Sequence, residues 1–220
     1  ITYSYDVEDS SGDSVSQTAK ITITGTNDAP VITGDVGGSV TEESTLTVSG
    51  TLSITDVDTN EAGFQAGTIT GNYGSLTIDA AGDWTYTVDN SSASVQALGS
   101  GVTAKDTIAV KSSDGTTKNV VITINGTDDD PVVSGAVTGA ASDNDAAFTV
   151  DLLAGATDVD TNDTLTVSNI TTTGDLSGIT VSGNTLNVDP SKYKSLAAGA
   201  KEEITYSYDV EDSSGDSVSQ

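Results

Sequence analysis

The sequence predicts an all-β protein built of tandem Greek-key β-sandwich domains arranged end to end. Apolar residues alternate with polar ones along most of the chain, which is typical of strands with one buried face. Thr, Ser, Val and Ile are abundant, and 23 Gly with many Asn and Asp supply turns between short strands. Long segments also recur at a fixed spacing, which indicates repeated domains.

An unchanged repeat sets the period of the chain. Residues 1–17 return as residues 204–220, an offset of 203 residues (204 − 1). Two weaker repeats mark a half-period, with offsets of 101 (126 − 25) and 102 (158 − 56): GTNDAP at 25–30 with GTDDDP at 126–131, and DVDTN at 56–60 with 158–162. The array therefore alternates two related units of about a hundred residues, the usual size of one small sandwich.

Boundaries are expected just after Pro30 and Pro131, because a residue without a backbone N–H suits the exit from a final strand. Residues 1–30 are then the C-terminal strands of a preceding, partial repeat, 31–131 form a complete repeat, and 132–220 form a repeat that lacks its last strand. Such a repeat has an unpaired edge. The missing strand is expected of a segment cut from a longer array. We expect that residues 18–30 of another molecule can fill the unpaired edge by strand addition.

The strands are expected in the following order. In 1–30, Tyr3, Tyr5 and Val7 alternate before a turn, and Ile21 and Ile23 alternate after it. In 31–131 the alternating apolar residues are Leu46 and Val48, Leu52 and Ile54, Leu76 and Ile78, Trp84, Tyr86 and Val88, Ile108 and Val110, and Val120, Ile122 and Ile124. In 132–220 they are Phe148 and Val150, Leu165 and Val167, Leu186 and Val188, and Tyr206, Tyr208 and Val210.

Two local features add detail to these repeats. Asp114-Gly115 lies between two strands and predicts a hairpin with a type I′ turn, in which both central residues have φ > 0. The segment Pro190 to Leu196 predicts a single helical turn. Trp84 lies in the alternating run WTYTV, so we interpret it as a core residue and not as a platform for stacking a sugar.

Composition excludes several classes of function. The chain of 220 residues has 33 Asp plus Glu against 7 Lys plus Arg, a net charge of −26, and no Cys, His or Met. The missing residue types exclude thiol nucleophiles, zinc sites and His-based triads. The charge disfavours nucleic acid and anionic membranes as partners, and no apolar run approaches the roughly 20 residues needed to span a bilayer. We expect no enzyme; a carboxylate glycosidase would need two convergent acids in a cleft, which a narrow sandwich without inserted loops hardly provides.

The acids recur at four places in the units: the exit linkers, the DVDTN loops, the start of each repeat, and the run before each final hairpin turn. Ca²⁺ takes six to eight oxygen ligands, and two Asp separated by one residue of an extended strand lie on one side of the chain. We therefore expect Ca²⁺ at the joints between repeats. The alternative is that these acids are solvated turn formers. The candidate ligands are Glu8, Asp9, Asn27, Asp28, Glu42, Asp56, Asp58, Asn60, Glu61, Asp128, Asp129, Asp143, Asp158, Asp160, Asn162 and Asp163.

The motifs GTNDAPVI, YGSLTIDAAGDWTYTVDN, VQALGSG and VVITINGTDDDP resemble a VCBS repeat of large Gram-negative surface proteins over residues 25–131. Residues 132–220 are similar to the cadherin-like repeats of RTX adhesins, and the linker NDAP resembles the cadherin joint. The resemblance implies one ligand set of Asn27, Asp28, Glu42, Asp56 and Asp58, and a second of Asp128, Asp129, Asp143, Asp158 and Asp160.

The same resemblance implies a role. These repeats would be extracellular spacers, exported by type I secretion, in the extender region of an adhesin that serves cell adhesion or biofilm formation. Calcium shared between neighbouring repeats of the chain would turn a flexible linker into a rigid joint. The alternative function is a β-sandwich module that binds a glycan or a protein through Trp84 or a loop.

Overall fold

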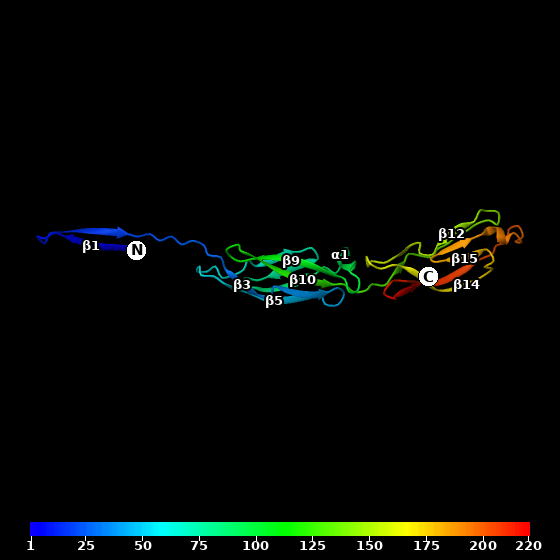
Figure 1. Cartoon of the computed structure of the whole chain (residues 1–220), viewed down its shortest axis with the longest axis horizontal. Coiled ribbons are helices and arrows are strands. Elements are labelled where there is room, and N and C mark those ends of the chain that lie inside the picture. Colours follow the sequence, from blue (N-terminus) through cyan, green and yellow to red (C-terminus); the bar gives the residue numbers. More distant parts are fainter.

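The computed structural model describes residues 1–220 as three parts placed in line: a hairpin, a first β-sandwich and a second β-sandwich (Figure 1). A stretch without secondary structure, residues 21–30, joins the hairpin to the first sandwich. None of the helices has the length and hydropathy needed to cross a bilayer. The predicted class, β-sandwich domains arranged end to end, is confirmed.

The hairpin consists of β1 (Thr2–Glu8) and β2 (Ser14–Lys20), which pair antiparallel along their whole length. Ile1 and Ile21 continue the pairing through two backbone hydrogen bonds of 2.9 and 3.0 Å. We expected a strand around Ile21 and Ile23, but β2 ends at Lys20. The side chains of Ile21 and Ile23 are both exposed.

The first sandwich packs a five-stranded sheet, in the order β3-β5-β8-β7-β6, against a three-stranded sheet, β4-β10-β9. The only parallel pair of these two sheets is β4 with β10. The elements are β3 (Val31–Gly34), β4 (Gly37–Thr41), β5 (Thr47–Thr55), β6 (Gly67–Thr70), β7 (Gly74–Ile78), β8 (Asp83–Val88), α1 (Ala93–Gln96), β9 (Thr103–Lys111) and β10 (Thr117–Asn125).

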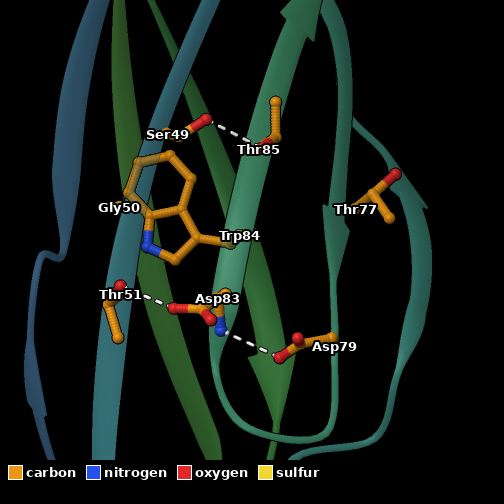
Figure 2. A pocket seen from close by; sticks show the side chains of 8 residues that line it. All are labelled: Ser49, Gly50, Thr51, Thr77, Asp79, Asp83, Trp84 and Thr85. Carbon is orange, nitrogen blue, oxygen red and sulfur yellow. Dashed lines mark hydrogen bonds between the residues drawn. The ribbon is translucent and has the colours of Figure 1, made fainter.

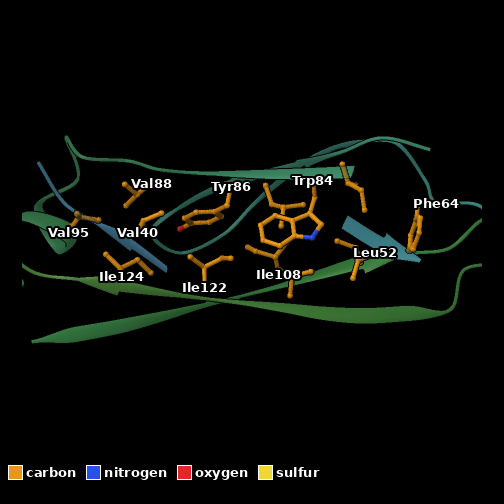
Figure 3. Close-up of a cluster of buried hydrophobic side chains, with 14 residues drawn as sticks. Val40, Leu52, Phe64, Trp84, Tyr86, Val88, Val95, Ile108, Ile122 and Ile124 are labelled. Atoms are coloured by element: carbon orange, nitrogen blue, oxygen red, sulfur yellow. The ribbon is translucent and has the colours of Figure 1, made fainter. Parts of the chain in front are cut away.

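Most of the core of this sandwich comes from the alternating residues that the sequence indicated, and Val40, Phe64 and Val95, which it did not indicate, complete the core (Figure 3). Trp84 is 2 % exposed, and its indole Nε1 donates a hydrogen bond of 3.0 Å to the Asp35 carbonyl. Gly50 makes room for the ring, because a Cβ there would lie 2.5 Å from Trp84 Cζ2. The prediction of Trp84 as a core residue is confirmed, whereas Leu46, at 37 % exposure, lies outside the core.

The turn between β9 and β10 is a hairpin, but the predicted turn type is wrong. Only Gly115 has a positive φ, of 94°. Gly115 N donates to the Ser112 carbonyl at 3.0 Å, and Ser112 N donates to the Thr116 carbonyl at 2.9 Å. These bonds describe a three-residue loop in which one residue is left-handed, and such a loop needs glycine only at that position.

A buried carboxylate that the sequence did not single out fixes the β6–β7 turn. Asp106 on β9 is 1 % exposed. Its Oδ1 accepts from Asn72 N at 3.0 Å, and its Oδ2 accepts from Tyr73 N at 3.0 Å and from the Tyr86 hydroxyl at 2.8 Å. Asp106 belongs to the three-stranded sheet, whereas its donors lie in the β6–β7 turn and on β8 of the five-stranded sheet. Its hydrogen bonds therefore join the two sheets.

The second sandwich is smaller, with the sheets β11-β13, β12-β16-β15 and β14-β17-β18. Its buried hydrophobic cluster consists of Leu152, Leu186, Tyr208 and Val210. The expected helical turn is a 3₁₀ turn, η1 (Pro190–Tyr193). The strands are β11 (Val132–Val133), β12 (Phe148–Asp151), β13 (Ala156–Thr157), β14 (Thr166–Thr173), β15 (Ile179–Ser182), β16 (Thr185–Val188), β17 (Thr205–Glu211) and β18 (Ser217–Ser219).

Candidate metal centre

Acidic groups from both sandwiches meet where the linker of residues 126–131 joins them. The linker supplies Asp128 and Asp129. The second sandwich supplies a loop that follows β13 and the hairpin turn between β17 and β18. We call this region the second junction.

Backbone amides fix the loop and the linker of the second junction to each other. Asp160 N donates to Asp158 Oδ1 at 2.9 Å, and Asp129 N donates to Asp160 Oδ2 at 3.0 Å. Five other carboxylate oxygens of the junction are buried and have no hydrogen-bond partner: Asp128 Oδ1, Asp129 Oδ2, Asp158 Oδ2, Asp160 Oδ1 and Asp212 Oδ2. Burial of unpaired carboxylate oxygens is strongly unfavourable, so this arrangement fits a cation that would coordinate them.

Two groups of acids are close enough to share ions. Carboxylate oxygens of Asp128, Asp160 and Asp163 lie within 4.8 Å of one another, and so do those of Asp128, Asp212 and Asp216. Asp128 belongs to both groups. The Ser213 hydroxyl donates to Asp163, which joins the hairpin turn to the loop.

Glu42 belongs to this second junction, which corrects the expectation that it would lie with Asn27 and Asp28. Its buried carboxylate accepts from Thr127 N at 2.9 Å and from Gln96 Nε2 at 3.4 Å. The cause is the parallel pairing of β4 with β10, in which Thr41 lies opposite Asn125. Parallel strands end on the same side, so Glu42 emerges beside the linker that leaves its own sandwich.

Burial and neighbouring negative charges raise the pKa values of several acids at the second junction. Burial, then the charges of Glu43 and Asp160, raise the pKa of Asp129 to about 6. Burial also raises the pKa of Glu42 and of Asp160, although the amides of Thr127 and Asp129 oppose the rise. Each shift means that the ionised form is unfavourable in a junction without a cation.

The closeness of two carboxyl groups has a similar effect. The neighbouring carboxyl group of Asp128, followed by burial, raises the pKa of Asp216, and their oxygens lie within 4.8 Å of each other. A proton and a cation would therefore compete for this place.

The first junction, between residues 27–28 and the first sandwich, repeats the same backbone pattern. Asp58 N donates to Asp56 Oδ1 at 2.9 Å, and Asp28 N donates to Asp58 Oδ2 at 2.7 Å. Asp56 Oδ2 and Glu61 Oε2 are buried without a partner. Burial, then the charges of Asp58 and Asp56, raise the pKa of Glu61.

Asn27 joins this group through Asp114 of the β9–β10 turn. The Ser112 hydroxyl and the Thr116 amide lower the pKa of Asp114 to about 2, and the nearby Asn27 side chain lowers it further. The structure thus places five predicted candidates at the first junction: Asn27, Asp28, Asp56, Asp58 and Glu61.

Three other predicted candidates, Glu8, Asp9 and Asp143, are not brought to either junction, and two more, Asn60 and Asn162, lie there without a visible role. The turn that carries Glu8 and Asp9 points away from the first sandwich, and Asp9 Oδ1 accepts the amides of Ser11 and Asp13 (Figure 1). Asp143 Oδ1 accepts from Ser142 Oγ and Asn144 Nδ2 beside it, apart from the second group in which we expected it. Asn60 and Asn162 lie in the loops of the two junctions, but both are exposed. For these residues the role of a solvated turn former fits better.

The sequence reasoning missed two junction acids, Asp114 and Asp216, and it recognised Asp212 only as part of the acidic run before the final hairpin turn, without naming it as a ligand. All three lie in the hairpin turn that precedes the last strand of a sandwich. Because the last strand leaves at the far end of its sandwich, the turn before it lies at the near end, beside the incoming linker. The recurrence of acids in both turns was the available signal.

The surface beside Trp84 was the alternative site, and it is already internally bonded (Figure 2). A hollow of about 430 Å³ is lined by Ser49, Gly50, Thr51, Thr77, Asp79, Asp83, Trp84 and Thr85. Asp79 Oδ1 accepts three backbone amides, and Asp83 accepts the Thr51 hydroxyl at 2.7 Å. Since Trp84 is buried, it presents no face on which a sugar could stack.

Models of two protein families match the two sandwiches. Residues 27–126 match the model of the bacterial cadherin-like domain, and residues 127–220 match that of the cadherin-like domain. The chain carries two tandem cadherin-like domains. The two matches meet within the linker, at residues 126 and 127. No curated protein sequence matches the chain.

Three of the solved structures that match are a human desmocollin ectodomain, a protocadherin and a bacterial adhesin. The human desmocollin-1 ectodomain is 11 % identical over 94 % of this chain and 38 % of its own, with a TM-score of 0.41. Extracellular cadherin domains 1–4 of protocadherin gamma B7 are 13 % identical over 100 % and 56 %, with a TM-score of 0.42. A Ca²⁺-stabilized adhesin that helps an Antarctic bacterium bind ice is 16 % identical over 100 % and 54 %, with a TM-score of 0.27. The chain therefore spans 38 to 56 % of the solved chains that it matches.

Proposed function

We propose that the two cadherin-like domains are extender repeats of a large secreted bacterial surface adhesin, held rigid by Ca²⁺ at the junctions between them. One observation carries this proposal. Carboxylates from the first domain, the linker and the second domain converge at the second junction, and five of their oxygens are buried without a partner. A cation bound there would be held by both domains at once.

The chemistry of the donors favours Ca²⁺. The groups at hand are carboxylates and backbone carbonyls, which are hard oxygen ligands, and the chain has no Cys or His to hold zinc. Ca²⁺ tolerates irregular geometry and high ligand numbers, whereas Mg²⁺ demands near-octahedral geometry and keeps several waters. The proposed ligands are Glu42, Asp128, Asp129, Asp158, Asp160, Asp163, Asp212 and Asp216 at the second junction, and Asn27, Asp28, Asp56, Asp58 and Glu61 at the first.

The proposed role is mechanical. Screening acts over about 8 Å at physiological salt, so acids that are crowded at a junction repel one another even though acids elsewhere on the rod do not. With an affinity of about 10⁻⁴ M and calcium near 10 mM, occupancy stabilises the joined state by about 2.7 kcal/mol per site. That free energy is enough to convert a flexible linker into a rigid one.

Small-angle X-ray scattering of the whole chain tests this role. When Ca²⁺ replaces a chelator, we expect the radius of gyration to rise. The distribution of distances between the two domains should become narrower. Mg²⁺ at the same concentration is the control and should have a smaller effect. Equal scattering curves in Ca²⁺ and in chelator would refute the proposal, and native mass spectrometry would count the bound ions.

The cellular setting is part of the same proposal. The resemblance to VCBS and cadherin-like repeats of RTX adhesins supports export by type I secretion and a place on the outer surface, as a spacer in cell adhesion or biofilm formation. Antibodies against residues 31–131 should label intact cells that express the whole adhesin. Labelling that appears only after lysis would contradict this location.

A second copy of the chain is a proposed partner, and one comparison within the structure supports it. Residues 1–17 and 204–220 have the same sequence, yet Tyr208 is 4 % exposed in the second domain while Tyr5 is 51 % exposed in the hairpin. Residues 18–20 of the expected donor segment 18–30 already belong to β2. We therefore propose that the whole hairpin, with residues 18–30 behind it, replaces β17–β18 in another molecule.

Light scattering over a range of concentrations tests this exchange. The mass of the full chain should rise with concentration, whereas a chain without residues 1–20 should stay monomeric. The deletion leaves both sandwiches intact, because β1 and β2 pair only with each other. A full chain that stays monomeric at every concentration would rule the exchange out.

A further inference from the structure

The second junction also contains a direct contact between the two domains that needs no ion. The Thr161 hydroxyl donates a hydrogen bond of 3.0 Å to the carbonyl oxygen of Ala97, and Thr161 N lies 3.5 Å from the same oxygen. Ala97 ends α1 of the first domain. Thr161 follows Asp160 in the loop of the second domain, so a neutral group stands next to the acids.

Two glycines shape the segment that accepts Thr161. A Cβ on Gly126 would lie 1.6 Å from the Leu98 carbonyl oxygen, so only glycine lets the linker pass this close to the segment. A Cβ on Gly99 would lie 3.2 Å from Asp160 Cγ. The segment Ala97–Gly99 is therefore packed against the linker on one side and against the acidic loop of the next domain on the other.

The second domain repeats the backbone of this segment at its own far end. Leu98 N donates to the Val95 carbonyl at 3.0 Å, and Leu196 N donates to the Tyr193 carbonyl at 3.0 Å. This alignment puts Ser195 at the position of Ala97. Thr59 is the counterpart of Thr161, at an offset of 102 (161 − 59). Each domain thus carries a Thr in its DVDTN loop and a matching carbonyl segment after its helical turn.

We propose that Ala97–Gly99 is a docking surface for the DVDTN loop of the following domain, and that Thr161 is a positioning residue that sets the angle between the domains without a metal ion. The inference concerns the junction of the proposed function, but it does not depend on Ca²⁺. A neutral hydrogen bond is insensitive to salt, whereas the acids repel until they are screened or bound. The contact selects one orientation, and the acids hold it once a cation is present.

The test replaces Thr161 by Val in the full chain, which removes the hydroxyl and keeps the shape of the side chain. Thr59→Val is the matched control, because Thr59 has no contact with a preceding domain in this chain. The chain lacks Cys, so Cys introduced at the exposed positions Thr87 and Thr180 take spin labels selectively. Double electron–electron resonance then gives the distance distribution between the two domains.

The deciding condition is chelator with 1 M salt, where screening acts over about 3 Å and the acids contribute little. There we expect T161V to widen the distance distribution about two-fold or more, T59V to leave it unchanged, and Thr161→Ser to restore it. A T161V distribution equal to that of the unmodified chain would overturn the inference. Calcium affinity from calorimetry should stay within about three-fold in T161V, so failure of the docking surface and failure of the calcium joint are separate outcomes.

Discussion

Replacement of Asp160 by Asn removes one negative charge from the centre of the second junction. Asp160 is 3 % exposed; its Oδ2 accepts Asp129 N, and its Oδ1 has no partner. Asp160 also belongs to the group with Asp128 and Asp163. The amide of Asn keeps one oxygen for either role. The substitution therefore changes charge far more than shape.

The magnitude follows from this geometry. A carboxylate at a typical Ca²⁺–oxygen distance of about 2.4 Å attracts the ion by about 3.5 kcal/mol even at the dielectric constant of water. If the Asn oxygen recovers somewhat less than half of this, the loss is about 2 kcal/mol, or about thirty-fold in affinity. From an affinity of about 10⁻⁴ M, stabilisation by 10 mM Ca²⁺ falls from about 2.7 to about 0.9 kcal/mol.

Calcium titration by calorimetry measures the affinity, and urea unfolding followed by the fluorescence of Trp84 measures the stabilisation of the first domain. In chelator, D160N should be at least as stable as the unmodified chain, because it relieves repulsion among the acids. Asp58→Asn is the matched control: it occupies the same place at the first junction and should leave the second site intact. An unchanged calcium affinity of the second site in D160N would refute the reasoning.

Three further predictions follow. Asp106→Asn should lower the free energy of unfolding by about 3 kcal/mol in urea, since one buried amide then faces a donor instead of an acceptor. In chelator, thermal stability should rise as the pH falls from 7 to 5, because folded Asp129, with its pKa raised to about 6, takes up a proton that the unfolded chain binds only near pH 4; a fall in melting temperature would contradict this. Gly34→Ala should destabilise by more than about 2 kcal/mol and Gly115→Ala by about 1: both have positive φ, but only at Gly34 would a Cβ lie 2.4 Å from a backbone oxygen, so equal losses in urea unfolding would be the wrong result.

Local patterns in the sequence predicted the features that depend on neighbouring residues. Alternation identified Trp84, Tyr86 and Ile122 as core residues, because the side chains of a strand point to opposite faces in turn. The Asp-x-Asp loops and their linkers also pair as expected, with the linker amides of Asp28 and Asp129 bonded to the second Asp of each loop. These contacts recur because both units repeat the same short motifs.

Contacts between distant strands limited what could be predicted at the junctions. The sequence gives no sign that β4 pairs parallel with β10, and this pairing moves Glu42 to the opposite end of its domain. Asp114 and Asp216 were missed, and Asp212 was not named as a ligand, for a related reason: their turns reach a junction only through the direction of the last strand. The ligand set therefore depends on topology as well as on motifs.

The 17 residues that occur twice show most clearly what sequence alone determines. It specifies the same antiparallel hairpin in both copies, because pairing and turn depend on residues close together in the chain. Burial differs, since the second copy packs on Leu152 and Leu186 while the first has no sheet against it. The sequence determined strands, repeats and acidic loops, whereas the tertiary structure decided which faces are buried and which acids meet, because those depend on groups far apart in the chain.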